Sequence, residues 1–117
     1  MESELKRILV LDIPVAHLRY KGSSKKYVVW TIIDEEPLFS YDDDIQYSKV
    51  TVDIDIYSDS NYLNIMSSIK NIMKQNEWTW EEDSTEMYET DTKLYHRTCT
   101  FSKERKIWNG KYRFKKR

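Results

Sequence analysis

The sequence is poor in the residues that cross-link, bend or break a chain. Cys99 is its only cysteine, so no disulfide can form within the chain, which fits a reducing compartment. With two glycines and two prolines, it holds no collagen-like repeat, no flexible linker and no glycine-rich phosphate loop. Its apolar runs are too short to cross a membrane, and its N-terminus does not resemble a signal peptide. We therefore expect a soluble protein made in the cytosol.

Charge is abundant but divided along the chain. Residues 34–59 hold nine acidic residues and one basic residue, and residues 81–91 hold six acidic residues and none that is basic. Residues 102–117 hold eight basic residues and one acidic residue. Such blocks are typical of solvated loops and tails. They would also suit a head-to-tail contact, in which the acidic flank of one subunit meets the basic tail of the next and the subunits close into a ring.

Residues 48–57 show the clearest structural pattern, a strict alternation of two kinds of side chain. The apolar side comprises Val50, Val52, Ile54 and Ile56, and the polar side comprises Thr51, Asp53, Asp55 and Tyr57. A period of two, with β-branched residues on one side, is typical of a strand that has one buried and one solvated face. Residues 60–75 then change to helical spacing, which predicts an amphipathic helix over the apolar face of this strand.

The N-terminal half gives shorter signals. Residues 3–11 have the spacing of a short helix, which Pro14 ends. Residues 15–20 and 27–34 favour strands, and the segment between them supplies the turn of a hairpin. Residues 34–46 have no period and predict a loop, long for so small a domain.

The C-terminal half predicts two more hairpins. One joins residues 78–82 to residues 93–101 through an acidic connection, and Asn109-Gly110 predicts the tight turn of the other. The whole pattern predicts a single α+β domain over residues 1–102, with an antiparallel sheet of about four strands flanked by two main helices. Residues 103–117 would add a basic, aromatic C-terminal hairpin or tail.

One group of carboxylates could hold a metal ion. Asp53 and Asp55 share a face of the long strand, and Asp42, Asp43 and Asp44 come shortly before it, an arrangement that a metal-dependent nuclease could use. No lysine or histidine flanks these aspartates as a nuclease site would require, however, and the solvated face of a sheet normally carries polar residues. We favour the plain reading of a solvated face.

His17, His96 and Cys99 are the candidate ligands of a zinc site. Structural zinc normally takes four ligands in paired spacings, and these three have no such pairing. His96 and Cys99 are three residues apart and would point to opposite faces of a strand, which also argues against a catalytic Cys–His pair, although His17 could approach Cys99. We expect no catalytic residue, no metal site and no cofactor.

The C-terminal segment interleaves aromatic and basic side chains. Trp108, Tyr112 and Phe114 stand among six lysines and arginines, including Lys111 and Arg113. This combination could stack bases and neutralise phosphates, or it could dock a protein through aromatic anchors. Because the rest of the domain is acidic, docking to protein is favoured over nucleic acid.

The order of these signals resembles the small tail-terminator, or tail-completion, proteins of long-tailed bacteriophages and prophages. The N-terminal helix leads to Ile13-Pro14-Val15 and then to an aromatic strand, Tyr27-Val28-Val29-Trp30. A loop with Tyr41-Asp42-Asp43-Asp44 precedes the long strand and its helix, and an acidic connection leads into Leu94-Tyr95-His96-Arg97-Thr98. The similarity covers about residues 5–102 and leaves out the basic tail.

The resemblance implies a structural protein, without enzymatic activity, that forms a hexameric ring at the head-proximal end of the tail tube. Such a ring would contact the major tail tube protein, stop its polymerisation and offer a surface to head-completion or connector proteins. The implied location is the host cytoplasm during assembly and then the virion, with no membrane partner. The alternatives are another head–tail connector protein or, from a different class, a small nuclease that uses Asp53 and Asp55.

That family has no catalytic residues to transfer to this chain, so we expect its function to reside in interfaces. The residues that we expect at partner contacts are acidic, aromatic or basic: Asp42, Asp43, Asp44, Asp53, Asp55, Tyr88, Trp108, Lys111 and Arg113. Charge reversal at Asp53 and Asp55 should then weaken assembly and leave the monomer folded.

Overall fold

The computed structural model describes residues 2–40 and 45–108, which form an α+β fold of two helices and six strands. The elements in chain order are α1 (Glu2–Ile8), β1 (Val15–His17), β2 (Lys26–Ser40), β3 (Ile45–Ser58), α2 (Leu63–Gln75), β4 (Thr79–Asp83), β5 (Met87–Glu89) and β6 (Leu94–Trp108). The predicted class and the two helices are confirmed. No helix in these two stretches is long and apolar enough to span a lipid bilayer.

The strands make one mixed sheet in the order β1-β2-β3-β6-β4, with β5 also paired to β6. Every pairing is antiparallel except that of β1 with β2, which is parallel. The prediction of about four antiparallel strands was therefore too low in number and wrong in the direction of β1. Strand β1 lies within the predicted strand of residues 15–20, whereas β5 was not predicted, because its three residues are too few to show a period in the sequence.

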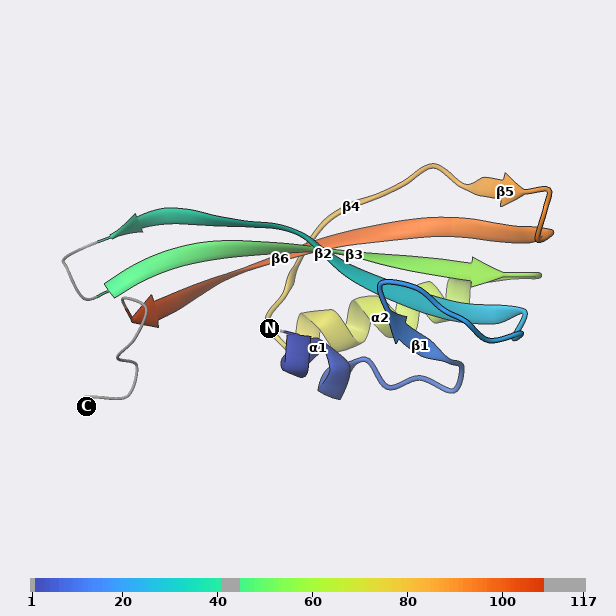
Figure 1. Ribbon diagram of the computed structural model, residues 1–117, viewed down its shortest axis with the longest axis horizontal. Helices are drawn as coiled ribbons and strands as arrows, with labels where there is room; N and C mark the ends of the chain where they lie inside the picture. The colour runs from blue at the N-terminus through green and yellow to red at the C-terminus, as the bar shows by residue number, and fades with distance from the viewer. Residues whose placement is uncertain (1, 41–44, 109–117) are drawn as a thin grey trace.

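The core lies between one face of the sheet and the two helices. Figure 1 shows α1 and α2 on the same side of the sheet. The predicted alternation of β3 is confirmed, because its four apolar side chains are fully buried and the opposite set is only partly buried. Met66, Ile69 and Met73 of α2 join the same cluster, together with Leu5 and Leu9 from the N-terminal segment. The other face of the sheet, which bears Asp53 and Asp55, is named the open face below.

The predicted hairpin between residues 15–20 and 27–34 is wrong, because β1 and β2 run parallel, with Val15 opposite Val28 and His17 opposite Trp30. At Leu18 the backbone φ is 72°, and the following residues return the chain to the end of the sheet from which β1 started. Strand propensity does not encode this path, since two strands joined by a long enough connection can pair in either direction.

In the segment that connects β1 to β2, residues 18–25, the Tyr20 ring lies close to Gly22. A Cβ atom at Gly22 would lie 2.1 Å from the Tyr20 hydroxyl oxygen, so only glycine fits without displacing the ring. The same hydroxyl accepts a hydrogen bond of 3.0 Å from the backbone N–H of Ser24. The Tyr20 ring stacks on Tyr27, with ring centroids 4.3 Å apart.

The loop predicted for residues 34–46 is also wrong for the part that the structure describes, because β2 continues to Ser40 and β3 begins at Ile45. Pro37 interrupts the sequence pattern but is tolerated, since this part of β2 is an edge strand that needs no outward N–H donor. Register shifts at Ile33 and Leu38 add two bulges, which hid the alternation.

These residues build a three-stranded arm, defined here as residues 34–40 of β2, 45–50 of β3 and 103–108 of β6. Figure 1 shows the arm extending well beyond the helices. The molecule accordingly measures 51 Å along its longest axis, against 25 and 24 Å along the others. The first part of the predicted basic tail, residues 103–108, is thus strand, and the turn predicted at Asn109-Gly110 lies outside the described residues.

The second predicted hairpin is confirmed, since β4 pairs with β6 in antiparallel register from Thr79 opposite Ser102 to Asp83 opposite Cys99. The acidic connection is less irregular than expected, because it includes β5, which places Tyr88 opposite Tyr95.

Candidate interface for assembly

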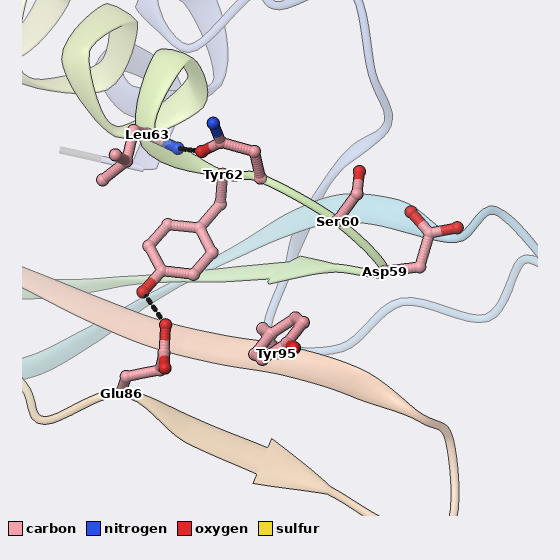
Figure 2. A pocket seen from close by; sticks show the side chains of 7 residues that line it. Asp59, Ser60, Tyr62, Leu63, Glu86 and Tyr95 are labelled. Carbon is pink, nitrogen blue, oxygen red and sulfur yellow. Dashed lines mark hydrogen bonds between the residues drawn. The ribbon is translucent and has the colours of Figure 1, made fainter.

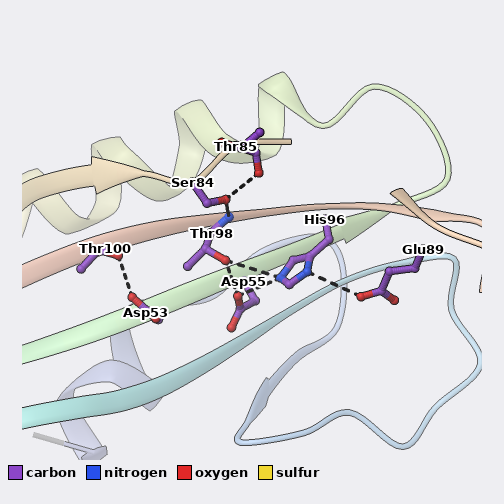
Figure 3. A network of polar contacts seen from close by, with 8 residues as sticks. All are labelled: Asp53, Asp55, Ser84, Thr85, Glu89, His96, Thr98 and Thr100. Carbon is purple, nitrogen blue, oxygen red and sulfur yellow. Dashed lines mark hydrogen bonds and ion pairs between the residues drawn. The ribbon is translucent and has the colours of Figure 1, made fainter. Parts of the chain in front are cut away.

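On the open face, polar side chains of β3 contact polar side chains of the neighbouring strand β6 (Figure 3). The Thr100 hydroxyl donates a hydrogen bond of 2.6 Å to Asp53 Oδ1, and the Thr98 hydroxyl donates one of 2.6 Å to Asp55 Oδ1. His96 Nε2 lies 2.9 Å from the same Asp55 oxygen. Both aspartates that were expected at an interface are therefore already engaged by their own chain, and they are held in place on a partly buried surface.

The same face carries a row of stacked rings, Tyr20, Tyr27, Tyr57 and His96, with neighbouring centroids 4.3, 4.7 and 4.2 Å apart. His96 ends the row, and its Nδ1 lies 3.6 Å from the Glu89 carboxylate. Burial, followed by the negative charge of Asp55, raises the pKa of Tyr57 to about 12. Sequence reasoning missed this row, because only the strand register brings residues so distant in the chain together.

The three candidate zinc ligands are not brought together. Cys99 is buried on the helix side of β6, where burial, followed by the charge of Asp83, raises the pKa of its thiol to about 12. His17 stacks on Trp30. It lies on β1, three strand spacings from Cys99 on β6, or about 14 Å. Across residues 2–40 and 45–108 no group of three or more His, Cys, Asp or Glu side chains could hold a metal ion.

A groove of about 430 Å³ opens at the start of α2 (Figure 2). Tyr62 and Tyr95 form its aromatic wall, and the Tyr62 hydroxyl donates a hydrogen bond to the Glu86 carboxylate. Arg97 donates a hydrogen bond of 3.3 Å to the same hydroxyl oxygen. Tyr88, one of the expected contact residues, has its ring edge-on to Tyr95 at 5.1 Å and is half exposed.

A second groove of about 430 Å³ lies between the end of α2 and β4. We name it the lysine–tryptophan groove after the residues that line it, which are Lys70, Asn71, Lys74, Trp78, Trp80 and Phe101. The Trp80 side chain is 52% exposed, a large apolar surface for a single residue. Lys70 lies over the Trp80 ring at 5.0 Å and forms an ion pair of 2.7 Å with Asp83. Sequence reasoning found Trp80 only as part of a strand.

The arm separates charge between its two edges. Its β2 edge begins with Asp34, Glu35 and Glu36, and its β6 edge carries Lys103 and Arg105. Side chains of the two edges form one ion pair within the subunit, in which Arg105 reaches across β3 to Glu35 over 2.7 Å. Glu36 remains exposed and has no ion pair with any described residue.

Of the remaining expected contact residues, the structure describes only Trp108. Trp108 is the last residue of β6, opposite Ile45. Asp42, Asp43 and Asp44, which follow β2, and Lys111 and Arg113, which follow β6, lie outside the described residues. Of the nine residues, the structure therefore places four: Asp53 and Asp55 on the open face, Tyr88 on β5 and Trp108 at the end of β6.

No model of a protein family matches the chain, and no curated protein matches it. Function is therefore inferred from the residues and from the geometry described above.

Proposed function

We propose that this chain is a structural protein of a long-tailed phage or prophage that assembles with copies of itself into a ring at the head-proximal end of the tail tube. The ring, which the sequence resemblance implies to be a hexamer, stops polymerisation of the major tail tube protein and presents a surface to the head-completion proteins. The protein acts in the host cytoplasm during assembly and remains in the virion.

The observation that carries this proposal is the arm. A core sheet needs only the strand lengths that its helices can cover. Val50 is still buried in the core and Lys103 still contacts Glu4 of α1, yet β2, β3 and β6 continue past this row over residues 36–40, 45–49 and 104–108. A three-stranded extension of this kind reaches outside its own subunit. Its acidic and basic edges also suit a heterologous contact, in which different surfaces of successive copies meet.

The partly buried open face and the exposed aromatic side chains add support. Trp80 and Tyr88 are each about half exposed, on β4 and β5, and aromatic residues are the usual anchors of protein interfaces. A nuclease that uses Asp53 and Asp55 gains no support, because among the described residues no group of three or more His, Cys, Asp or Glu side chains could hold a metal ion, and Thr98 and Thr100 already bond one oxygen of each carboxylate.

The experiment is to measure the mass of the purified chain by native mass spectrometry and light scattering over a range of concentrations, alone and with isolated tail tubes. A ring should form in solution or on the tubes, and tubes assembled with the protein should have a uniform length. A monomer that persists and leaves tube length unregulated would contradict the proposal. Labelling of isolated tails and isolated heads with an antibody against the protein distinguishes a terminator from another neck protein. The antibody should bind the end of a headless tail only if the protein is the terminator.

A further inference from the structure

The two outer strands of the arm each leave one edge uncovered. In the arm, β3 lies in the middle, with β2 on one side and β6 on the other. β1 pairs with β2 only as far as Trp30, and β4 pairs with β6 only as far as Ser102. Among the described residues, no second strand therefore lies beside residues 34–40 of β2 or residues 103–108 of β6. These two stretches are the β2 edge and the β6 edge of the arm.

The outward backbone groups of the β2 edge follow from its bonds to the β1 side. Val28 donates its N–H, and Trp30 offers its C=O, to residues that flank β1. Outward groups alternate along a strand, and the register shift at Ile33 moves them from even-numbered to odd-numbered residues. The N–H and C=O of Glu35 and the C=O of Pro37 therefore point away from β3.

The β6 edge is regular. The backbone N–H and C=O of Thr98 both bond to Ser84, which places the backbone groups of even-numbered residues on the side away from β3. The register with β3 continues without a break to Trp108, so the N–H and C=O of Glu104 point outward as well. The β6 edge has neither the proline nor the bulge that commonly protect an exposed strand from pairing. It can therefore accept one more strand.

Charge determines which strand suits the β6 edge. The β6 edge carries three basic residues and one acidic residue, and the β2 edge carries Asp34, Glu35 and Glu36 and no basic residue. Pairing two like edges would place like charges side by side, whereas pairing the β6 edge with a β2 edge brings opposite charges together. Residues 109–117 contain five basic residues and no acidic residue, so their charge suits the β6 edge less well. Within one subunit β3 separates the two edges, so the matching β2 edge must come from a second copy.

We propose that the β6 edge of one copy pairs with the β2 edge of the next copy, as neighbouring strands of one continuous sheet. β2 and β6 both run antiparallel to β3 and hence in the same direction, so arms that point the same way around a ring bring these edges together in parallel. The contact is heterologous and can repeat from copy to copy. The inference deepens the proposed function and rests on it in taking a second copy as the partner.

β4 determines the register of this pairing. Because β4 occupies the outer side of β6 up to Ser102, the first outward groups beyond it are those of Glu104. In a parallel pair a residue bonds to the residues before and after its neighbour, so Glu35 lies level with Arg105 and donates its N–H to the C=O of Glu104. β1 and β4 widen the sheet next to the helices, so neighbouring copies diverge there, and the bulge at Ile33 bends β2 where this divergence begins.

A proline at position 35 tests the backbone pairing. Glu35→Pro removes the outward N–H together with the carboxylate, whereas Glu35→Ala removes the carboxylate alone. Because this N–H points away from β3, the proline should leave the pairing of β2 with β3 intact, as Pro37 does. Glu35→Pro should weaken assembly about tenfold more than Glu35→Ala, since the Glu104 carbonyl loses its donor. Equal assembly by the two folded variants would overturn the backbone pairing.

Cross-linking tests the same contact without a proline. In the proposed register Glu36 of one copy lies beside Lys106 of the next on the open face. Within one subunit these residues are at least two strand spacings apart, about 10 Å, whereas a disulfide joins Cα atoms no more than about 7 Å apart. A chain carrying Glu36→Cys and Lys106→Cys should therefore form a ladder of disulfide-linked multimers under mild oxidation. Glu36→Cys with Lys74→Cys, which places the second thiol on α2, is the control and should form none. Cys99 is buried and does not interfere.

The failure of this pairing can be distinguished from the failure of the proposed function. A wild-type chain that forms rings while the cross-linking variant gives no ladder would overturn the pairing. A ladder that appears only after deletion of residues 109–117 would also overturn it and would assign the β6 edge to the C-terminus of the same chain. A wild-type chain that forms no ring even on tail tubes would instead contradict the proposed function.

Discussion

His96 Nε2 and Asp55 Oδ1 lie 2.9 Å apart and connect β6 to β3 on the open face of the sheet. The Thr98 hydroxyl donates to the same oxygen at 2.6 Å, so Asp55 gathers two contacts from one neighbouring strand. Asp53, two residues earlier, receives one such contact from the part of the chain that the structure describes, from Thr100. The two aspartates appear equivalent in the sequence but differ in how firmly each is tied to the fold.

We expect Asp55→Asn to destabilise the monomer more than Asp53→Asn does. Each substitution replaces a charge-assisted hydrogen bond with a neutral one, but only the first also alters the 2.9 Å contact with His96 Nε2. The expected cost is about 1–2 kcal/mol for Asp55→Asn and about 0.5–1 kcal/mol for Asp53→Asn. Urea unfolding of both variants under the same conditions measures the difference, and equal costs would contradict this assignment.

This difference changes how charge reversal at these positions is interpreted. The sequence alone predicts that reversal at Asp53 and Asp55 weakens assembly and leaves the monomer folded. The structure adds hydrogen bonds from β6 to both carboxylates, so part of any effect will come from the stability of the monomer. Thermal unfolding of each variant must therefore accompany the assembly measurement.

Asp83 should contribute stability that is lost in acid. Burial favours its neutral form, but hydrogen bonds from Lys70 and Trp80 outweigh this effect and hold the pKa of Asp83 below its ordinary value. A carboxyl group with a lowered pKa in the fold stabilises the protein above its unfolded pKa, near 4, and this stabilisation disappears as the pH falls through the lower, folded value.

Lys70→Met tests this contribution. At pH 7 it should cost about 0.5 kcal/mol, a small figure because the Lys70 side chain is partly exposed and solvent screens the pair. The difference from the wild-type chain should shrink as the pH falls below about 4, since Asp83 is then increasingly protonated in both proteins. Lys74→Met, which removes a lysine one turn further along the helix, is the control. A cost that does not change with pH would show that Lys70 acts through packing alone.

Cys99 should be chemically silent in the folded protein. Its side chain is fully buried and its thiol has a pKa of about 12, so it forms almost no thiolate at neutral pH. A thiol reagent should therefore label the chain only as it unfolds. Because the folded state holds the thiol protonated, stability should fall as the pH rises from the ordinary thiol pKa of about 8.5 towards 12. Cys99→Ala should reduce this alkaline loss, and rapid labelling of the native chain would contradict the burial of the thiol.

The sequence predicted the elements that show their period within a single segment. The alternation in β3 and the apolar stripe of α2 can be recognised because buried positions recur at a fixed spacing along each segment. The buried faces were therefore identified correctly. The arm was missed because Pro37 and the bulges at Ile33 and Leu38 interrupt the alternation of β2. The parallel pairing of β1 depends on the path of a connection, and no local pattern records that path.

The same limit applies to the candidate site. Asp53, Asp55 and Tyr88 were selected because charge and aromatic character can be read from a sequence. The lysine–tryptophan groove and the row of rings from Tyr20 to His96 depend instead on register between distant strands, and a single sequence does not contain that register. The order of charges predicted a contact between the acidic and basic segments of different subunits, whereas the ion pair that the structure shows, Glu35 with Arg105, lies within one subunit.

Tyr88 allows an interface role to be separated from a structural one. Its ring is half exposed and touches Tyr95 only edge-on, so Tyr88→Ala should lower the stability of the monomer by about 0.5–1 kcal/mol. If Tyr88 anchors a partner, the same change should weaken assembly by a larger factor than Met87→Ala, which alters a slightly less exposed neighbour on β5. Native mass spectrometry of both variants compares them directly. Equal assembly by the two variants would remove Tyr88 from the interface.

Gly22 and Tyr20 form a pair whose coupling can be measured. Because a Cβ atom at Gly22 would lie 2.1 Å from the Tyr20 hydroxyl oxygen, Gly22→Ala must push the Tyr20 ring off Tyr27 and break the end of the aromatic row. We expect a loss of about 1–2 kcal/mol in the free energy of unfolding. In a Tyr20→Ala background the added methyl group meets no ring, so the same Gly22→Ala change should cost almost nothing. Urea unfolding of the four chains completes a double-mutant cycle. Additive costs would mean that the two residues do not restrain each other, and the return of the chain from β1 to β2 would then need another explanation.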